Sequence, residues 1–168
     1  HSSYRLNDQA NELEVKLHWQ NDKGLKVTKS YLFQRGSHTI TLKYLVDNGT
    51  TSPWQGQIYG QLQRTETSVG QSHFVYTYTG GAISSPSKRY EKISFEEILD
   101  GSFTTQNRPG WAGGWVAMIQ HYFVAAFVPE RELSYHYYTN VIGGTRYILG
   151  LYGPSQTVAP GTQQVFNL

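Results

Sequence analysis

The most apolar run in the chain is Gly113-Gly114-Trp115-Val116-Ala117-Met118-Ile119-Gln120-His121-Tyr122-Phe123-Val124-Ala125-Ala126-Phe127-Val128-Pro129. It contains no Asp, Glu, Lys or Arg, begins at two glycines and ends at a proline. Its seventeen residues, interrupted by Gln120 and His121, are too few and too polar to span a bilayer easily. The sequence therefore predicts that the folded chain buries this run.

Periodicity within the run is compatible with either a helix or strands. Trp115 and Ile119 would share one face of a helix, but β-branched and aromatic residues at both ends favour strands. We expect two strands, over 114–120 and 122–128, at the centre of a sheet and covered on both faces. The glycines would allow close approach of the backbone, and Pro129 would end the pairing because it has no N–H to donate.

Composition points to a β-rich chain. Charged residues are 15% of the total, whereas Tyr (13), Phe (7), Trp (4) and Gly (17) are plentiful, as cross-strand aromatic pairs and turns require. The formal charge of +2 indicates neither a nucleic-acid partner nor a membrane-surface stripe. With no cysteine, disulfides and thiolate metal sites are excluded. The length of 168 residues favours one domain over residues 1–168.

Short stretches of alternating polar and apolar residues predict the other strands. The clearest runs from Leu13 to Trp19, which should bury Leu13, Val15, Leu17 and Trp19 on one face. The expected strands cover 12–34 (as a hairpin), 39–46, 56–64, 74–79, 133–141, 146–152 and 163–168. Many short strands separated by turn residues predict an all-β sandwich.

Between residues 79 and 112 this alternation ends. Gly80-Gly81, Pro86 and a cluster of charged residues predict an exposed excursion from the sheets. Ser94 and Glu97 have the spacing of a capping box, which predicts a short helix over 95–100. The stretch 101–112 is expected to be a loop.

The sequence predicts no catalytic residue, no cofactor site and no metal site. The six histidines lack metal-ligand spacing, and no motif places a carboxylate beside one of them, as sugar chemistry would require. His121 would need a polar partner if it is buried. Trp54 and Trp111, in expected loops, could line a groove for a sugar or an extended peptide.

The apolar run also resembles the signature of the large periplasmic domain of YidC, from the YidC/Oxa/Alb family of membrane protein insertases. Other pieces that match this family follow in its order. They are Tyr31-Leu32-Phe33-Gln34-Arg35-Gly36, Gly60-Gln61-Leu62, and Gly80-Gly81-Ala82 leading to Lys88-Arg89-Tyr90-Glu91-Lys92 and Phe95. The likeness extends from about Tyr4 to Phe166, nearly the whole chain.

This resemblance implies an antiparallel β-supersandwich like that of galactose-mutarotase-like proteins, with at most one or two short helices. It also implies the later portion of the domain, without its N-terminal strands and without the membrane insertase domain. The expected location is the periplasmic face of the bacterial inner membrane. The expected role is a non-catalytic scaffold that contacts accessory subunits of the Sec translocon, of the SecD/SecF type, and nascent membrane proteins, but no nucleic acid.

The expected contact surface lies within 79–112 and centres on Lys88, Arg89, Tyr90, Glu91 and Lys92. A solvated connection without a function is an equally good explanation of this charged segment. Two other functions stay open. One is a carbohydrate-binding or sugar-isomerising protein of the same fold, and the other is a cleft that binds extended polypeptide by main-chain pairing at a sheet edge.

Overall fold

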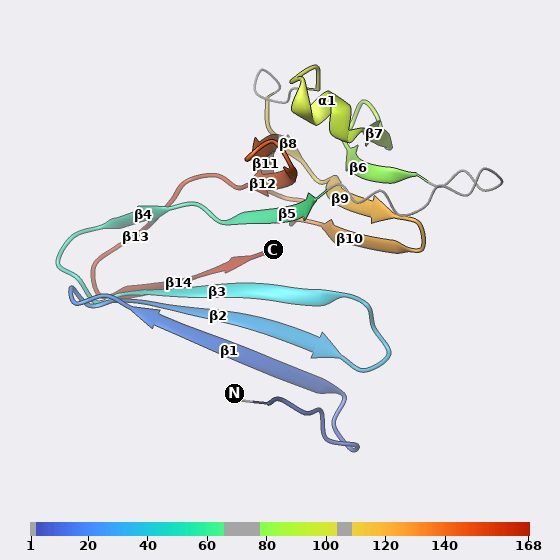
Figure 1. Ribbon diagram of the computed structural model, residues 1–168. Helices are drawn as coiled ribbons and strands as arrows, with labels where there is room; N and C mark the ends of the chain where they lie inside the picture. Colours follow the sequence, from blue (N-terminus) through green and yellow to red (C-terminus); the bar gives the residue numbers. More distant parts are fainter. Residues whose placement is uncertain (1–2, 66–77, 104–108) are drawn as a thin grey trace. The chain divides into compact units, whose positions relative to one another are not determined.

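The computed structural model describes residues 3–65, 78–103 and 109–168 (Figure 1). These residues form fourteen strands and one short helix, and all strand pairs are antiparallel, which confirms the predicted all-β class. The chain divides into two compact units, His1–Ile58 with Ser155–Leu168, and Tyr59–Pro154. Each unit is described by itself, and the single domain over 1–168 stays a prediction. Within the described ranges, no helix has the length and apolar character needed to cross a membrane.

The first unit contains a four-stranded sheet in the order β1-β2-β3-β14. Its strands are β1 (Glu12–Gln20), β2 (Leu25–Gln34), β3 (Ile40–Asn48) and β14 (Thr162–Asn167). A two-stranded sheet joins β4 (Trp54–Gly56) to β13 (Gln156–Val158). The hairpin over 12–34, the third strand and the last strand are thereby confirmed.

Burial in this unit departs from the prediction at β1. The alternation is present, but Leu17 is 51% exposed and Trp19 is 56% exposed, because β1 is the edge strand and only β2 lies beside it. The expectation of a groove-lining indole is also wrong for Trp54. Its ring packs edge-on against Phe166, with 6.3 Å between ring centroids.

The second unit contains two four-stranded sheets. The first has the order β10-β9-β6-β7, and we call it the β10–β7 sheet. It consists of β6 (Thr79–Ser84), β7 (Glu91–Ile93), β9 (Trp115–Gln120) and β10 (Phe123–Phe127). The other has the order β5-β12-β11-β8. It consists of β5 (Tyr59–Thr65), β8 (Trp111–Ala112), β11 (Ser134–Ile142) and β12 (Arg146–Tyr152).

Contacts between β6 and β12 join these two sheets. Gly81 lies so close to Leu149 that an added Cβ would be 2.6 Å from its Cδ2 atom. The helix α1 (Phe95–Leu99) also packs on β12, where Phe95 stacks on Tyr147 with ring centroids 4.4 Å apart. Buried Ile83, Ile93 and Ile148 complete this core. The arrangement is that of a sandwich, and the predicted hairpin over 133–152 and the predicted helix are confirmed.

Two other strand predictions change. The strand expected over 56–64 begins only at Tyr59, because β4 ends at Gly56 and pairs with β13. Of the strand expected over 74–79, residues 74–77 lie outside the described residues. Its last residue, Thr79, is the first residue of β6.

The expected excursion at Gly80-Gly81 is wrong. These residues belong to β6, an internal strand between β9 and β7, where Ala82 is 0% exposed and Ile83 is 2% exposed. The glycines allow close packing instead of marking a loop. A Cβ on Gly80 would be 2.5 Å from the hydroxyl of Tyr78, so the small residue fits where a larger one would clash.

The apolar run is only half a core. Its first half forms β9, where Val116 and Ala117 are each 1% exposed. Its second half forms β10, an edge strand, so the prediction that both strands lie centrally and covered is wrong. The turn between them is His121–Tyr122, and His121 is exposed with φ of 45°. It therefore needs no buried partner.

The entry into β9 is a second place where glycine is required. Gly114 has φ of 80°, and a Cβ there would lie 2.4 Å from the carbonyl oxygen of Ser84. Nearby, Tyr137 donates a hydrogen bond to the Gly113 carbonyl oxygen at 2.8 Å. Burial raises the pKa of the Tyr137 hydroxyl above its ordinary value, so this donor stays protonated.

Candidate functional site: two edges of one sheet

The predicted contact residues lie at the β7 edge of the β10–β7 sheet. Lys88, Arg89 and Tyr90 directly precede β7, and Glu91 and Lys92 are its first two residues. The idea that this segment completes no sheet is therefore wrong, because Glu91 pairs with Ile83 and Lys92 with Ala82. Exposure of the segment is as expected, since only Glu91 is partly buried.

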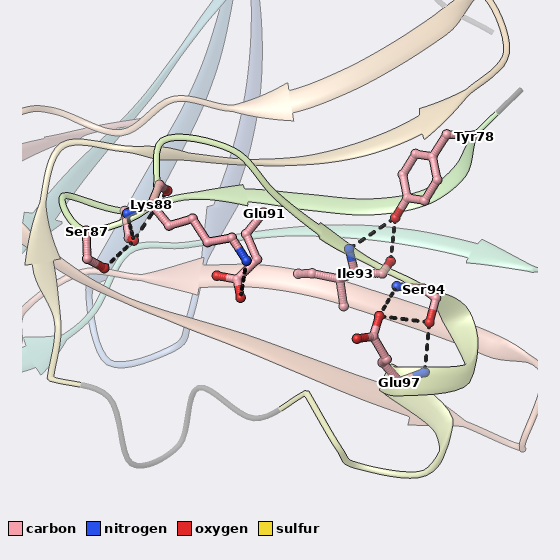
Figure 2. A network of polar contacts seen from close by, with 8 residues as sticks. Tyr78, Ser87, Lys88, Glu91, Ile93, Ser94 and Glu97 are labelled. Carbon is pink, nitrogen blue, oxygen red and sulfur yellow. Dashed lines mark hydrogen bonds and ion pairs between the residues drawn. The ribbon is translucent and has the colours of Figure 1, made fainter.

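A hydrogen-bonded turn fixes the start of this edge. The backbone N–H of Ser85 donates to the Lys88 carbonyl oxygen at 2.9 Å, and the Lys88 N–H donates to Ser85 Oγ at 3.1 Å. Lys88 Nζ then lies 3.4 Å from Glu91 Oε1, as Figure 2 shows. An ion pair with one largely exposed partner adds at most about 1 kcal/mol, so the backbone turn does most of the positioning.

Tyr78 holds the end of β7. Its hydroxyl accepts the Ile93 N–H at 3.1 Å and faces two carbonyl oxygens, of Gly81 at 2.6 Å and of Ile93 at 2.8 Å (Figure 2). Lys92 Nζ lies 4.6 Å from the centroid of the Tyr78 ring, a cation–π arrangement. Lys92 thus keeps its charge at the surface while its position is defined.

A capped helix follows this edge immediately. Ser94 Oγ accepts the Glu97 N–H at 3.1 Å, and Glu97 Oε2 accepts the Ser94 N–H at 2.7 Å, which is the predicted capping box (Figure 2). The last residue of β7 is Ile93, so chain pairing stops where the helix begins. The β7 edge is therefore short, charged and closed by a helix.

One aromatic contact links this edge to the centre of the sheet. The Tyr90 ring, in a residue that is 48% exposed, lies 6.0 Å from the ring of Trp115 with 47° between the planes. Trp115 is the first residue of β9 and is only half-buried, not a core residue as expected. Tyr90 is consequently supported from below while presenting one face to solvent.

The β10 edge of the same sheet has the opposite character, and sequence reasoning missed it. Four large apolar residues are exposed there: Tyr122 (85%), Phe123 (75%), Val124 (68%) and Val128 (63%). Together with Ala125, Ala126 and Phe127 they form an uncharged stretch of seven residues, which we call the β10 edge. The sequence signal was present as an uncharged run next to a turn, but a buried strand gives the same signal.

Comparison with known proteins identifies the family. A family model described as the YidC periplasmic domain matches residues 1–168. The chain is 41% identical over 165 residues to the membrane protein insertase YidC of Nitrosococcus oceani, and 40% identical over 166 residues to that of Methylococcus capsulatus. The chain belongs to the YidC periplasmic domain family.

The predicted resemblance and the predicted location, the periplasmic face of the bacterial inner membrane, are thereby confirmed. Each alignment covers 98% of this chain but only 29% and 30%, respectively, of the two relatives. The chain thus spans less than a third of the length of these relatives. Their name as insertases describes those whole proteins.

Other predicted chemical groups find structural explanations within this YidC periplasmic domain. Trp111 stacks on Tyr137, with ring centroids 4.4 Å apart, and donates from Nε1 to the Ser84 carbonyl oxygen at 3.1 Å, so it lines no open groove. His136 stacks on Tyr152 at 5.1 Å. Over residues 3–65, 78–103 and 109–168, no three His, Asp or Glu residues form a group that could hold a metal ion. His73 and Glu66 lie outside the described residues.

Proposed function

We propose that this domain is a non-catalytic periplasmic scaffold of a membrane protein insertase and that its β7 edge contacts accessory subunits of the Sec translocon, of the SecD/SecF type. Nascent membrane proteins are the second proposed class of partner. Support for the insertase context comes from the family and from the names of its relatives. A non-catalytic role agrees with these names.

The observation that carries the contact proposal is the surface formed by Lys88, Arg89, Tyr90 and Lys92. All four are exposed, they are consecutive apart from Glu91, and backbone pairing and the Tyr78 hydroxyl hold them in place. An aromatic side chain surrounded by charges has the composition of an interaction surface. Charges at a rim mainly set the rate of association, while an aromatic anchor sets the lifetime of the complex.

Two sets of variants test this proposal. Reversing Lys88, Arg89 and Lys92 to Glu should slow association with the Sec accessory complex, and Tyr90→Ala should speed dissociation. The control reverses Lys16, Lys23 and Lys26, three exposed lysines of the other unit, and should leave both rates unchanged. Surface plasmon resonance at two salt concentrations measures the rates.

Crosslinking in the assembled membrane complex provides the direct measurement. A photoreactive amino acid at Arg89 should crosslink to an accessory subunit, whereas the same group at Lys26 should not. If position 89 gives no product while position 26 does, the contact surface is on the wrong unit.

A separate assay tests the non-catalytic part. The purified chain should not accelerate mutarotation of common hexoses. An acceleration that disappears on changing His136 would favour the sugar-isomerising alternative.

A further inference from the structure

The β10 edge is exposed on both faces of the sheet. Successive residues of a strand point to opposite faces, yet Phe123 and Val124, which are neighbours, are 75% and 68% exposed. The register places Val124 opposite Ile119 and Phe123 opposite Gln120, so these side chains extend from the end of a two-stranded ribbon (Figure 1). Apolar surface of this kind is unusual on both faces of one strand.

The backbone of β10 is open as well. Among the described residues it pairs with β9 alone. In an antiparallel pair, alternate residues direct their N–H and C=O groups away from the partner strand, so an edge strand presents a row of unused groups. Natural proteins usually protect such a row with a charge, a proline or a bulge. From Tyr122 to Val128 there is no charged residue and no proline.

We propose that the β10 edge binds an extended, uncharged apolar segment of another polypeptide by strand addition. The main chain of the ligand would pair with the open side of β10, and its alternating side chains would contact Phe123 and Phe127 on one face and Val124 on the other. This mode gives affinity through the backbone and tolerates many ligand sequences. A strand without charge is complementary to a segment without charge.

Two other occupants fit the observations less well. A second copy of the chain, paired β10 to β10, would join only two five-residue strands, far less than the roughly 1,600 Å² buried in a standard interface. Insertion into lipid would bury the unpaired N–H and C=O groups of the edge, and open sheet edges do not occur within the hydrocarbon region of a bilayer. An added strand satisfies those same groups.

The nature of the ligand rests on the proposed role in membrane protein insertion, whose clients carry uncharged apolar segments. The site does not depend on the Sec contact, because β7 and β10 lie at opposite edges of the β10–β7 sheet. Strand addition can therefore fail while the Sec contact holds, and the reverse.

The test uses the 168-residue chain and a fluorescent peptide of alternating valine and threonine. Binding, followed by fluorescence anisotropy, should be lost when every second peptide nitrogen of the probe is methylated, because methylation removes the main-chain donors. Val124→Lys should weaken binding by at least about tenfold. Val165→Lys is the matched control, since Val165 is a 52% exposed valine on the edge strand β14, and it should not change binding.

Hydrogen exchange locates the bound peptide. Amides of β10 should exchange quickly in the free chain and slowly with peptide bound, with the change confined to 123–127. Phe123→Ser provides a second variant should Val124→Lys fail to fold. Protection of β10 in the free chain, equal binding of the methylated peptide, or equal loss with Val165→Lys would each overturn the proposal. So would a dimer in sedimentation that Val124→Lys dissociates, or binding of phosphatidylcholine vesicles in place of the peptide.

Discussion

The two edges of the β10–β7 sheet show how differently one sheet can end. At one edge, β7 has three residues, carries Glu91 and Lys92, and leads directly into a capped helix. At the other edge, β10 has five residues, none charged, and leaves both its side chains and its backbone open. Since a short charged edge is the usual protection against unwanted pairing, the open edge is the one that calls for a functional explanation.

The largest expected effect comes from breaking the pairing that joins both edges. Gly114→Ala would place a Cβ 2.4 Å from the Ser84 carbonyl oxygen, just before Trp115 pairs with Ser84 at the start of β9. Backbone atoms cannot move aside easily, so we expect a loss of about 3–5 kcal/mol in the free energy of unfolding. Urea denaturation measures it.

Gly113→Ala is the matched control for that clash. Gly113 also has a positive φ, 72°, but a Cβ there would meet nothing within 4 Å. Its loss should be the roughly 1–2 kcal/mol of a left-handed backbone alone. Equal losses at the two glycines would mean that the β6–β9 approach is less tight than the structure has it.

A smaller effect should follow from removing the support of Tyr90. Trp115→Ala should lower the free energy of unfolding by about 2 kcal/mol, below the 3–5 kcal/mol of a fully buried indole, because Trp115 is only half-buried. Trypsin should then cleave faster after Lys88 and Arg89. Trp19→Ala removes a 56% exposed indole from the other unit and should leave that cleavage rate unchanged. Unaltered cleavage in Trp115→Ala would show that Tyr90 needs no support from β9.

Both edges also show what the sequence could predict. The capping box of Ser94 and Glu97 acts within three residues, so the helix was predicted correctly. The hairpins over 12–34 and 133–152 follow equally local alternation and turn residues. Such features need no knowledge of distant parts of the chain.

Features that depend on distant neighbours were predicted poorly. Gly80-Gly81 suggested a loop because the sequence does not reveal that Leu149, far along the chain, lies against Gly81. The apolar run suggested two buried strands because an uncharged strand has the same pattern whether it is covered or open. The number of neighbouring strands, two for β9 and one for β10, is a property of the topology.

The helix that closes the β7 edge offers a more modest test. Ser94→Ala removes the acceptor for the Glu97 N–H, and the loss of an N-cap of this kind is about 1 kcal/mol. Thermal unfolding should detect it. Ser87→Ala, in the exposed turn before β7, should stay within about 0.5 kcal/mol of the parent chain. A loss as large for Ser87 would show that the turn, not the helix, secures this edge.

The smallest effect on stability, and the sharpest test of the comparison, comes from exchanging the protection of the two edges. Val124→Lys should change the free energy of unfolding by no more than about 0.5 kcal/mol, since Val124 is 68% exposed. Lys92→Val should lower it by about 0.5–1 kcal/mol through the lost contact with the Tyr78 ring. Self-association should nevertheless change in opposite directions, because a lysine on an edge strand discourages pairing and an apolar residue invites it. Light scattering at rising protein concentration should therefore begin later for Val124→Lys and earlier for Lys92→Val than for the parent chain. If Val124→Lys leaves the onset unchanged while Val165→Lys delays it, the open edge of this protein is β14, and the contrast between β7 and β10 does not govern how the chain meets other polypeptides.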